Sequence, residues 1–148
     1  MREQPLQLVV RPVTPRDIDA VVSLWGIVFP EYDDPARPQR DPRAGVERKL
    51  AFGGELFWLA ERAGEVAGTV MAGYDGHRGW IYSLGVHPDA RREGVARALL
   101  EIAEGALAAV GCPKVNLQVL AGNEAAQSFW RAAGYAQDDV VSFGKRLV

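Results

Sequence analysis

One stretch limits the fold of this chain more than any other, because it joins a strand to a helix through a charged loop. Residues 82–100 read YSLGVHPDARREGVARALL: an apolar run ends at Pro88, two arginines follow, and Gly94 stands directly before a helical repeat. The first N–H groups of such a helix lack helical partners, and the helix dipole favours an anion beside them. Gly94 has no Cβ to keep a ligand away, and the charges of Arg91 and Arg92 suit phosphate. The stretch therefore predicts a phosphate-bearing ligand at this loop, with a solvated helix start and surface arginines as the alternative.

The rest of the chain supplies the elements around this junction. Apolar residues alternate in runs typical of strands or recur at helical spacing, and proline, glycine, asparagine and aspartate mark the ends. We predict strands at residues 6–11, 55–62, 65–74, 80–86, 114–120 and 140–147, and helices at residues 15–28, 42–50, 94–110 and 123–133. The order β-α-α-β-β-β-α-β-α-β combines an antiparallel meander with a crossover helix. The strands on either side of that helix are therefore expected to run parallel in an α/β fold.

Composition and charge argue against several classes of protein. The chain has 148 residues, which suits a single domain over residues 1–148, and 48% of them are hydrophobic. Its net charge of −2 argues against nucleic-acid binding, and it has no apolar run long enough to span a bilayer. The N-terminal residues show no signal-peptide core, and the single cysteine, Cys112, cannot form an internal disulfide. We therefore expect a cytoplasmic protein without nucleic-acid or membrane partners, in which Cys112 is a small, partly buried apolar residue.

Other kinds of site lack their sequence signals. His77 and His87 are not at helical ligand spacing, so we expect no metal. Neither a Ser-His-Asp nor a Cys-His set can be argued from spacing. No G-x-G-x-x-G follows the first predicted strand, and no G-x-x-x-x-G-K-(S/T) occurs in the chain. These absences argue against a phosphate ligand that is bound through either of these two nucleotide-binding motifs.

Three motifs resemble a known family. The residues RREGVA at 91–96 resemble the (Q/R)-x-x-G-x-(G/A) motif of the GCN5-related N-acetyltransferases (GNAT), and LGVHP at 84–88 resembles the L-x-V-x-P segment that precedes it. NEAAQSFWRAAGY at 123–135 resembles the family's N-x-x-A-x-x-x-Y-x-x-x-G-(F/Y) helix. The resemblance covers nearly the whole chain. It implies the family's fold, a single mixed sheet of six to seven strands with four helices, in which two central parallel strands splay apart.

Further short segments resemble one small bacterial subgroup, the YpeA-type acetyltransferases. They are GYDGHRG, LGVHP and FGKRL, together with DP and VERKL around Asp41 and Leu50. This resemblance names no acceptor substrate.

The family resemblance implies acetyl-CoA as the co-substrate and assigns residues to it. In the family the loop grips the pyrophosphate; the matching residues here are Arg91, Arg92, Glu93, Gly94, Val95 and Ala96. Where the strands splay, the backbone of Leu84, Gly85 and Val86 would lack ladder partners, and the amides of the pantetheine arm would replace them. An N–H near Val86 is the implied partner of the thioester carbonyl. Asn123 could offer its amide to the same arm, and a plain helix N-cap explains it equally well.

Two aromatic residues are candidates for the chemistry. The amine must lose a proton, the thioester carbonyl must be polarised, and the departing thiolate is helped by a proton. The family's tyrosine acid falls at Trp130, whose indole N–H is only a hydrogen-bond donor. Ser128 or Tyr135 could substitute for it, and Trp130 could simply pack on the acyl-CoA arm or in the core. Tyr82 shares a strand face with Leu84 and is the candidate on the acceptor side, with a packed strand tyrosine as the alternative.

Charged residues near the predicted site have plainer explanations. Asp75 and His77 belong to a predicted hairpin turn, and turn chemistry accounts for Asp75. Glu31, Asp33 and Asp34 lie in a proline-rich loop, where they could attract a cationic amine or simply be solvated.

From these motifs we predict an N-acetyltransferase, of class EC 2.3.1, that transfers the acetyl group of acetyl-CoA directly to an amine. The acceptor is a small molecule or a protein amine. The alternative, kept open by Trp130, is a CoA-binding regulatory module without catalysis. A homodimer is left open.

Overall fold

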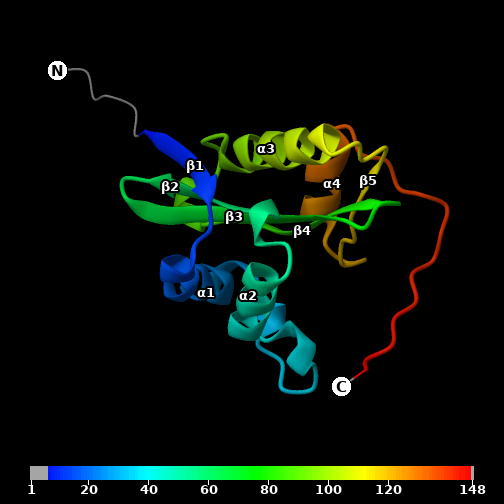
Figure 1. Cartoon of the computed structure of the whole chain (residues 1–148), viewed down its shortest axis with the longest axis horizontal. Coiled ribbons are helices and arrows are strands. Elements are labelled where there is room, and N and C mark those ends of the chain that lie inside the picture. Colours follow the sequence, from blue (N-terminus) through cyan, green and yellow to red (C-terminus); the bar gives the residue numbers. More distant parts are fainter. Residues whose placement is uncertain (1–6, 148) are drawn as a thin grey trace. The chain divides into compact units, whose positions relative to one another are not determined.

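The computed structural model describes residues 7–147, in which four α-helices and five strands form (Figure 1). The strands are β1 (Leu8–Pro12), β2 (Phe57–Arg62), β3 (Glu65–Tyr74), β4 (Gly79–Val86) and β5 (Val115–Asn116). The helices are α1 (Ile18–Val28), α2 (Pro42–Ala51), α3 (Val95–Ala109) and α4 (Glu124–Ala132). Short 3₁₀ turns are η1 (Pro15–Asp17), η2 (Pro30–Tyr32), η3 (Pro38–Arg40), η4 (Gly54–Leu56) and η5 (Pro88–Ala90). The chain divides into two compact units, one up to Asn116 and one from Leu117 onward, and the single domain stays a prediction.

Local signals in the sequence set most helix boundaries. The Oδ2 atom of Asp41 accepts a hydrogen bond from the N–H of Ala44 (2.9 Å), and Pro42 occupies the first position of α2. This is the cap-and-proline start that the sequence predicts. The first predicted helix begins instead with the turn η1, and its α-helical part starts at Ile18.

The sheet of the first unit has the order β1-β2-β3-β4-β5. The first four strands form an antiparallel meander, and β5 pairs with β4 in parallel after the crossover through α3. Helix α3 covers one face of this sheet, and α1 and α2 cover the other (Figure 1). The mixed sheet with a meander and one parallel crossover is thus confirmed.

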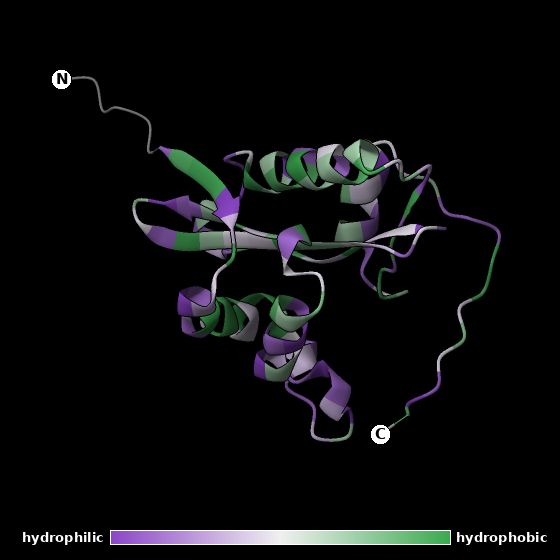
Figure 2. Cartoon of the chain, in the orientation of Figure 1, coloured by the Kyte–Doolittle hydropathy of each residue, from purple (hydrophilic) through white to green (hydrophobic). Residues whose placement is uncertain are grey.

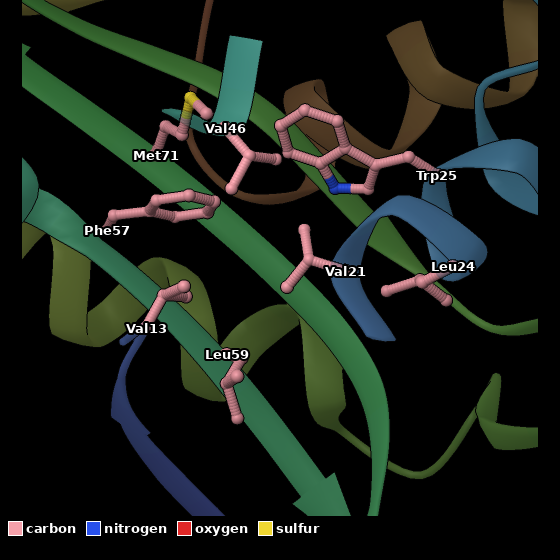
Figure 3. Close-up of a cluster of buried hydrophobic side chains, with 8 residues drawn as sticks. All are labelled: Val13, Val21, Leu24, Trp25, Val46, Phe57, Leu59 and Met71. Atoms are coloured by element: carbon pink, nitrogen blue, oxygen red, sulfur yellow. The ribbon is translucent and has the colours of Figure 1, made fainter. Parts of the chain in front are cut away.

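A cluster of apolar side chains joins α1 and α2 to the sheet. It consists of Val13, Val21, Leu24, Trp25, Val46, Phe57, Leu59 and Met71 (Figure 3). Each of these side chains is at most 8% exposed. On the crossover side, Cys112 is half-buried and its Sγ donates to the carbonyl of Lys114 (3.3 Å). Cys112 is therefore the partly buried residue that the sequence predicts.

The predicted sheet of six to seven strands is wrong for residues 7–147, which form a sheet of five. The strand predicted at 114–120 shortens to β5, and residues 140–147, predicted as a last strand, contain no strand. The apolar pattern of this last segment favours a strand, but a strand also needs a partner ladder and a face to pack on. Val140 and Phe143 are 78% and 93% exposed, so this segment has no such face.

The second unit is built around α4. In Figure 2 its last segment shows both hydrophobic and hydrophilic stretches, and residues 140–147 are all exposed. A side-chain hydrogen bond joins Gln118 to Ser142, so the segment after β5 and the last segment of the chain meet within this unit.

Candidate active site at the open edge of strand β4

Strand β4 is paired along one edge and largely open along the other. Its ladder with β3 runs from Gly79, opposite Tyr74, to Val86, opposite Gly68. Its ladder with β5 contains two pairs only, Gly79 with Val115 and Trp80 with Asn116. Among residues 7–147, no strand pairs with this second edge from Ile81 to Val86. Backbone groups on such an edge need partners from a ligand, from water or from another segment.

The splay predicted for the two parallel strands concerns the chain beyond Asn116. The pairing of β4 with β5 is parallel, as predicted, and it ends at Asn116. The segment from Leu117 onward belongs to the second unit. The splay itself therefore stays a prediction.

A bulge reshapes β4 next to its open part. Ser83 and Leu84 together stand opposite one residue of β3, because the register shifts between Thr69 and Met71. Ser83 has a φ of +50°, in the left-handed region that residues other than glycine rarely adopt. No sequence signal marks this position, since Ser83 lies inside an ordinary apolar run.

Gly85 is the point at which the C-terminal end of α1 meets β4. A Cβ added here would lie 2.7 Å from Cζ of Phe29 and 2.9 Å from Cγ2 of Val28. Both distances are too short for packed carbon atoms, so only glycine fits without movement. The neighbour that requires glycine is thus the C-terminal end of α1.

The loop after β4 is held against the sheet and leads into α3. The N–H of His87 donates to the carbonyl of Ala67 (2.7 Å), and His87 Nδ1 accepts from the N–H of Asp89 (3.0 Å). At the other end of the loop, Gly94 caps α3 with a φ of +81°. The N–H of Ala98 donates to the carbonyl of Gly94 (3.0 Å), which is the first helical bond.

The start of α3 offers backbone donors to an anion. The N–H groups of Val95, Ala96 and Arg97 precede the first bonded turn and have no helical acceptor. Gly94 has no side chain, and the space that a Cβ would occupy is open, with no atom within 4 Å of it. The dipole of a helix of 15 residues adds to the attraction for negative charge. The start of α3 therefore offers accessible backbone donors to an anion.

The charged side chains of the loop divide into two kinds. Arg91 and Arg92 are exposed, and Arg92 has a φ of +66°. Glu93 forms an ion pair with Arg62 at the end of β2 (Nε to Oε2, 3.1 Å). This pair offsets the carboxylate charge that would otherwise repel an anion at the start of α3.

Tyr82 lies on the same sheet face as α1 and α2, beside Trp80. The two rings are nearly parallel, with an interplanar angle of 16° and 6.3 Å between centroids. Gly73 of β3 stands opposite Trp80 and has no side chain, and Tyr82 keeps half of its surface exposed. Burial, and then the charge of Asp75, raises the pKa of Tyr82, so its phenol stays protonated at neutral pH. The pair forms a partly exposed aromatic wall on β4.

The charged residues near this wall serve mainly their own turns. Asp75 Oδ1 accepts hydrogen bonds from the N–H groups of His77 and Arg78 (2.7 Å each), and these bonds lower the pKa of Asp75. Asp34 Oδ1 likewise accepts from the N–H of Ala36 (2.9 Å). The turn explanation of Asp75 is therefore confirmed.

Two predicted site residues lie in the second unit, on α4. Asn123 caps this helix, since its Oδ1 accepts from the N–H of Ala126 (3.0 Å). Trp130 packs edge-on between Phe129 and Tyr135, with centroids 5.2 Å and 5.0 Å away. These contacts belong to α4 and the segment after it.

Sequence reasoning missed three side chains around the bulge: Trp25, Tyr32 and Thr69. They reach Ser83 through a chain of hydrogen bonds. The one available signal was Thr69, a hydroxyl inside the apolar run VAGTVMAG.

No group of three or more His, Cys, Asp or Glu side chains that could hold a metal ion occurs in the described part of the chain. No helix between residues 7 and 147 is both long and apolar enough to cross a membrane.

Comparisons with known proteins show which family the chain resembles. The model of the acetyltransferase (GNAT) family matches residues 21–135. Acetyltransferase SG1711 of Sodalis glossinidius (strain morsitans) is 48% identical over 133 residues, which are 89% of this chain and 90% of that protein.

Solved structures show the same fold at low sequence identity. The PaiA N-acetyltransferase of Thermoplasma acidophilum, in complex with coenzyme A, has a TM-score of 0.77 and 15% identity, covering 92% of this chain and 94% of that one. A GCN5-related N-acetyltransferase of Ralstonia eutropha JMP134 has a TM-score of 0.72 and 24% identity, covering 94% and 99%. Because the family model spans most of the chain and a relative shares nearly half of its aligned residues, the chain belongs to the GNAT family of acetyltransferases.

Proposed function

We propose that this acetyltransferase takes the acetyl group from acetyl-CoA and transfers it directly to an amine. One observation carries the proposal: the open edge of β4, from Ile81 to Val86, leads through a short loop to the anion-attracting start of α3. The pantetheine arm of CoA carries two amides and is followed by a pyrophosphate. A single CoA molecule can therefore satisfy both features. The complex of the Thermoplasma protein with coenzyme A supports the same ligand for this fold.

In this proposal, backbone groups hold most of the co-substrate. The backbone of Leu84, Gly85 and Val86 lies along the thioester and the pantetheine arm: one N–H of this segment meets the thioester carbonyl, and its other open N–H and C=O groups bond the amides of the arm. The loop of residues 91–96, with Gly94 at its turn, surrounds the pyrophosphate. Arg91 and Arg92 add long-range attraction, and Glu93 contributes its backbone because its carboxylate is paired with Arg62. Asn123 uses its carbonyl oxygen for the helix cap, which leaves its NH₂ group as the part that could meet the arm.

The aromatic wall on β4 is the proposed acceptor side. Acetyl-CoA supplies the activated acyl group, and the chain must supply a position for a neutral amine. Tyr82, protonated at neutral pH because its pKa is raised, can donate a hydrogen bond to the acceptor or to a water beside it. It is not a phenolate base at that pH. The rate should therefore rise with pH as the acceptor amine itself loses its proton, and then level off.

Trp130 supports a second candidate, a CoA-binding regulatory module without catalysis. The family's usual acid is a tyrosine at this position, and an indole cannot deliver a proton at neutral pH. Against this candidate, a thiolate can leave unaided because a thiol has a pKa near 8.5. Trp130→Tyr separates the two. If proton delivery limits the reaction, kcat should rise, whereas Trp130→Phe should retain most activity if the ring only packs. If the indole N–H binds sulfur, Trp130→Phe should lose about tenfold.

We also propose that the chain is of the YpeA type, acts in the cytoplasm and uses no metal. The short segments GYDGHRG, LGVHP and FGKRL support the first point.

Thermal unfolding and calorimetry with acetyl-CoA, CoA, ATP and NAD test the proposal. Acetyl-CoA and CoA should stabilise the fold by about 2.7 kcal/mol at a hundredfold excess over Kd, and ATP and NAD much less. A transfer assay that detects the released thiol, run over a panel of small and peptide amines, then identifies the acceptor. Absence of any shift with saturating acetyl-CoA contradicts the proposal. Tight CoA binding with no transfer to any amine favours the regulatory module.

A further inference from the structure

The bulge of β4 is held from inside the protein by a buried chain of hydrogen bonds. Trp25 Nε1 donates to Thr69 Oγ1 (2.9 Å), and Thr69 Oγ1 donates to the carbonyl of Ser83 (3.0 Å). Thr69 has no exposed surface and Trp25 is 2% exposed. A hydroxyl buried in an apolar cluster is costly unless it is bonded, and here it is bonded twice.

A second contact reaches the same residue from the loop between α1 and α2. The hydroxyls of Tyr32 and Ser83 are 2.9 Å apart and share a hydrogen bond. Tyr32 stacks on Phe29, with centroids 4.8 Å apart and an interplanar angle of 27°, and it meets Trp25 edge-on at 5.7 Å. The ring of Phe29 in turn packs closely against the backbone of Gly85. The end of α1 and the turn η2 thus hold the bulge on both sides, at Ser83 and at Gly85.

This support is needed because the ladder cannot supply it. A residue other than glycine at a φ of +50° persists only where its surroundings impose that shape. Within residues 7–147, the outer edge of β4 has no strand partner at Ser83 or Leu84 that could impose it. The hydrogen bonds from Thr69 and Tyr32 to Ser83 supply this constraint on its backbone conformation.

The hydrogen bond to Ser83 also sets the direction of the next N–H. In a trans peptide the N–H of one residue points opposite to the C=O of the residue before it. With the carbonyl of Ser83 fixed on Thr69, the N–H of Leu84 points away from β3. That direction leads to the open edge of β4.

We infer that Thr69, together with Trp25 and Tyr32, is a positioning residue for acetyl transfer: it aims the Leu84 N–H at the carbonyl oxygen of the bound acetyl group. The inference rests on the proposed function. A fixed backbone donor at that oxygen stabilises the charge that develops there, and its value depends on its aim. Thr69 acts through Ser83 and touches neither substrate.

Replacing Thr69 with valine or serine tests the inference. Thr69→Val keeps the shape and removes the hydroxyl, so we expect kcat to fall about thirtyfold to a hundredfold, less than the roughly 10²–10³ that follows complete removal of such a donor. The Kd of CoA, measured by calorimetry, should change less than threefold because the arm and the loop contacts remain. Thr69→Ser restores the hydroxyl and should keep kcat within about threefold.

Two controls separate positioning from stability. Val21→Ala creates a cavity in the same apolar cluster without touching the bulge, so it should lower the melting temperature and leave kcat unchanged. Ser83→Gly relieves the positive φ and removes the contact with Tyr32. It should leave the melting temperature unchanged or higher while lowering kcat, a pair of changes that a purely structural role does not produce. If Thr69→Val does not fold, Tyr32→Phe carries the test: it removes the hydroxyl that bonds Ser83 and keeps the ring, so it should also lower kcat.

The amide resonance of Leu84 gives a readout besides activity. In the wild type it should shift when acetyl-CoA is added, and Thr69→Val should move it before any ligand is present. If Thr69→Val keeps wild-type kcat and an unmoved Leu84 resonance, the positioning role is wrong while the proposed function stands. If the wild type itself transfers no acetyl group, the proposed function fails first.

Discussion

The two sides of the candidate site differ in the groups that form them: backbone groups on one side and side chains on the other. The proposed co-substrate side consists of backbone groups: the open edge of β4 and the N–H groups at the start of α3, with Gly94 at a φ of +81° between them. The proposed acceptor side consists of side chains on β4, chiefly the nearly parallel rings of Trp80 and Tyr82. Backbone groups are the same for any sequence that adopts the loop, whereas a wall of side chains changes with every substitution. The first side can therefore be shared across a family, and the second can distinguish one acceptor from another.

The largest expected effect would break the backbone-built side. Gly94→Val should weaken CoA binding about a hundredfold or more, because a branched side chain would stand where the ligand approaches the N–H groups. The positive φ adds a cost to folding of about 1–2 kcal/mol. Calorimetry with CoA and thermal unfolding measure the two effects.

Gly64→Val is the matched control for this change. Gly64 has a φ of +78° and no atom within 4 Å of an added Cβ, but it lies in the turn between β2 and β3. It should lose similar folding stability and bind CoA normally. Equal loss of CoA affinity in both variants would show that backbone strain, and not access to the loop, explains Gly94.

The second expected effect concerns the contact between α1 and the bulged strand. Gly85→Ala should lower the free energy of unfolding by about 2 kcal/mol, because its Cβ would overlap the ring of Phe29. Gly105→Ala, in α3 with open space around it, should instead raise stability by up to about 1 kcal/mol. Chemical denaturation measures both. A neutral Gly85→Ala would mean that the end of α1 moves freely relative to β4.

The third effect tests the side-chain wall. Tyr82→Phe should lower kcat/KM for the amine about fivefold, the value of one hydrogen bond, and leave the Kd of CoA unchanged. Because burial and Asp75 raise the pKa of Tyr82 above its usual value near 10, its ionisation should lower the wild-type rate only above about pH 10. That alkaline decline should vanish in Tyr82→Phe, as pH–rate profiles would show.

Tyr74→Phe removes a hydroxyl from the neighbouring strand β3 and should change neither constant. If Tyr82→Phe weakens CoA binding instead of amine turnover, the assignment of the two sides is wrong.

The smallest effect distinguishes charge from backbone on the co-substrate side. Arg91→Ala should weaken CoA binding about threefold at low salt and less at physiological salt, because an exposed charge is screened within about 8 Å. Arg16→Ala, an exposed arginine in η1, controls for the change in net charge. A loss for Arg91→Ala as large as that for Gly94→Val would move the main anion contact from the backbone to the side chain.

The sequence already determined the junction between β4 and α3, the caps of α2 and α4, and the meander before the crossover. These follow from local rules: a cap, a proline or a glycine acts within a few residues of itself, and a strand face repeats every second residue. The strand predicted at 140–147 does not form, because an apolar pattern by itself is not sufficient for a strand. A strand also needs a neighbouring strand to pair with, which no local pattern provides.

Only the tertiary structure decided the bulge at Ser83 and what holds it. Trp25, Thr69 and Ser83 are 44 and 14 residues apart along the chain, and they meet through hydrogen bonds of 2.9 and 3.0 Å. The residue type of Ser83 does not predict its positive φ, because Thr69 and Tyr32, which belong to other elements, impose this conformation. The sequence predicted where an anion is expected to bind, since that depends on neighbouring backbone groups. Folding decided which way the Leu84 N–H points, since that depends on residues brought together from three separate segments.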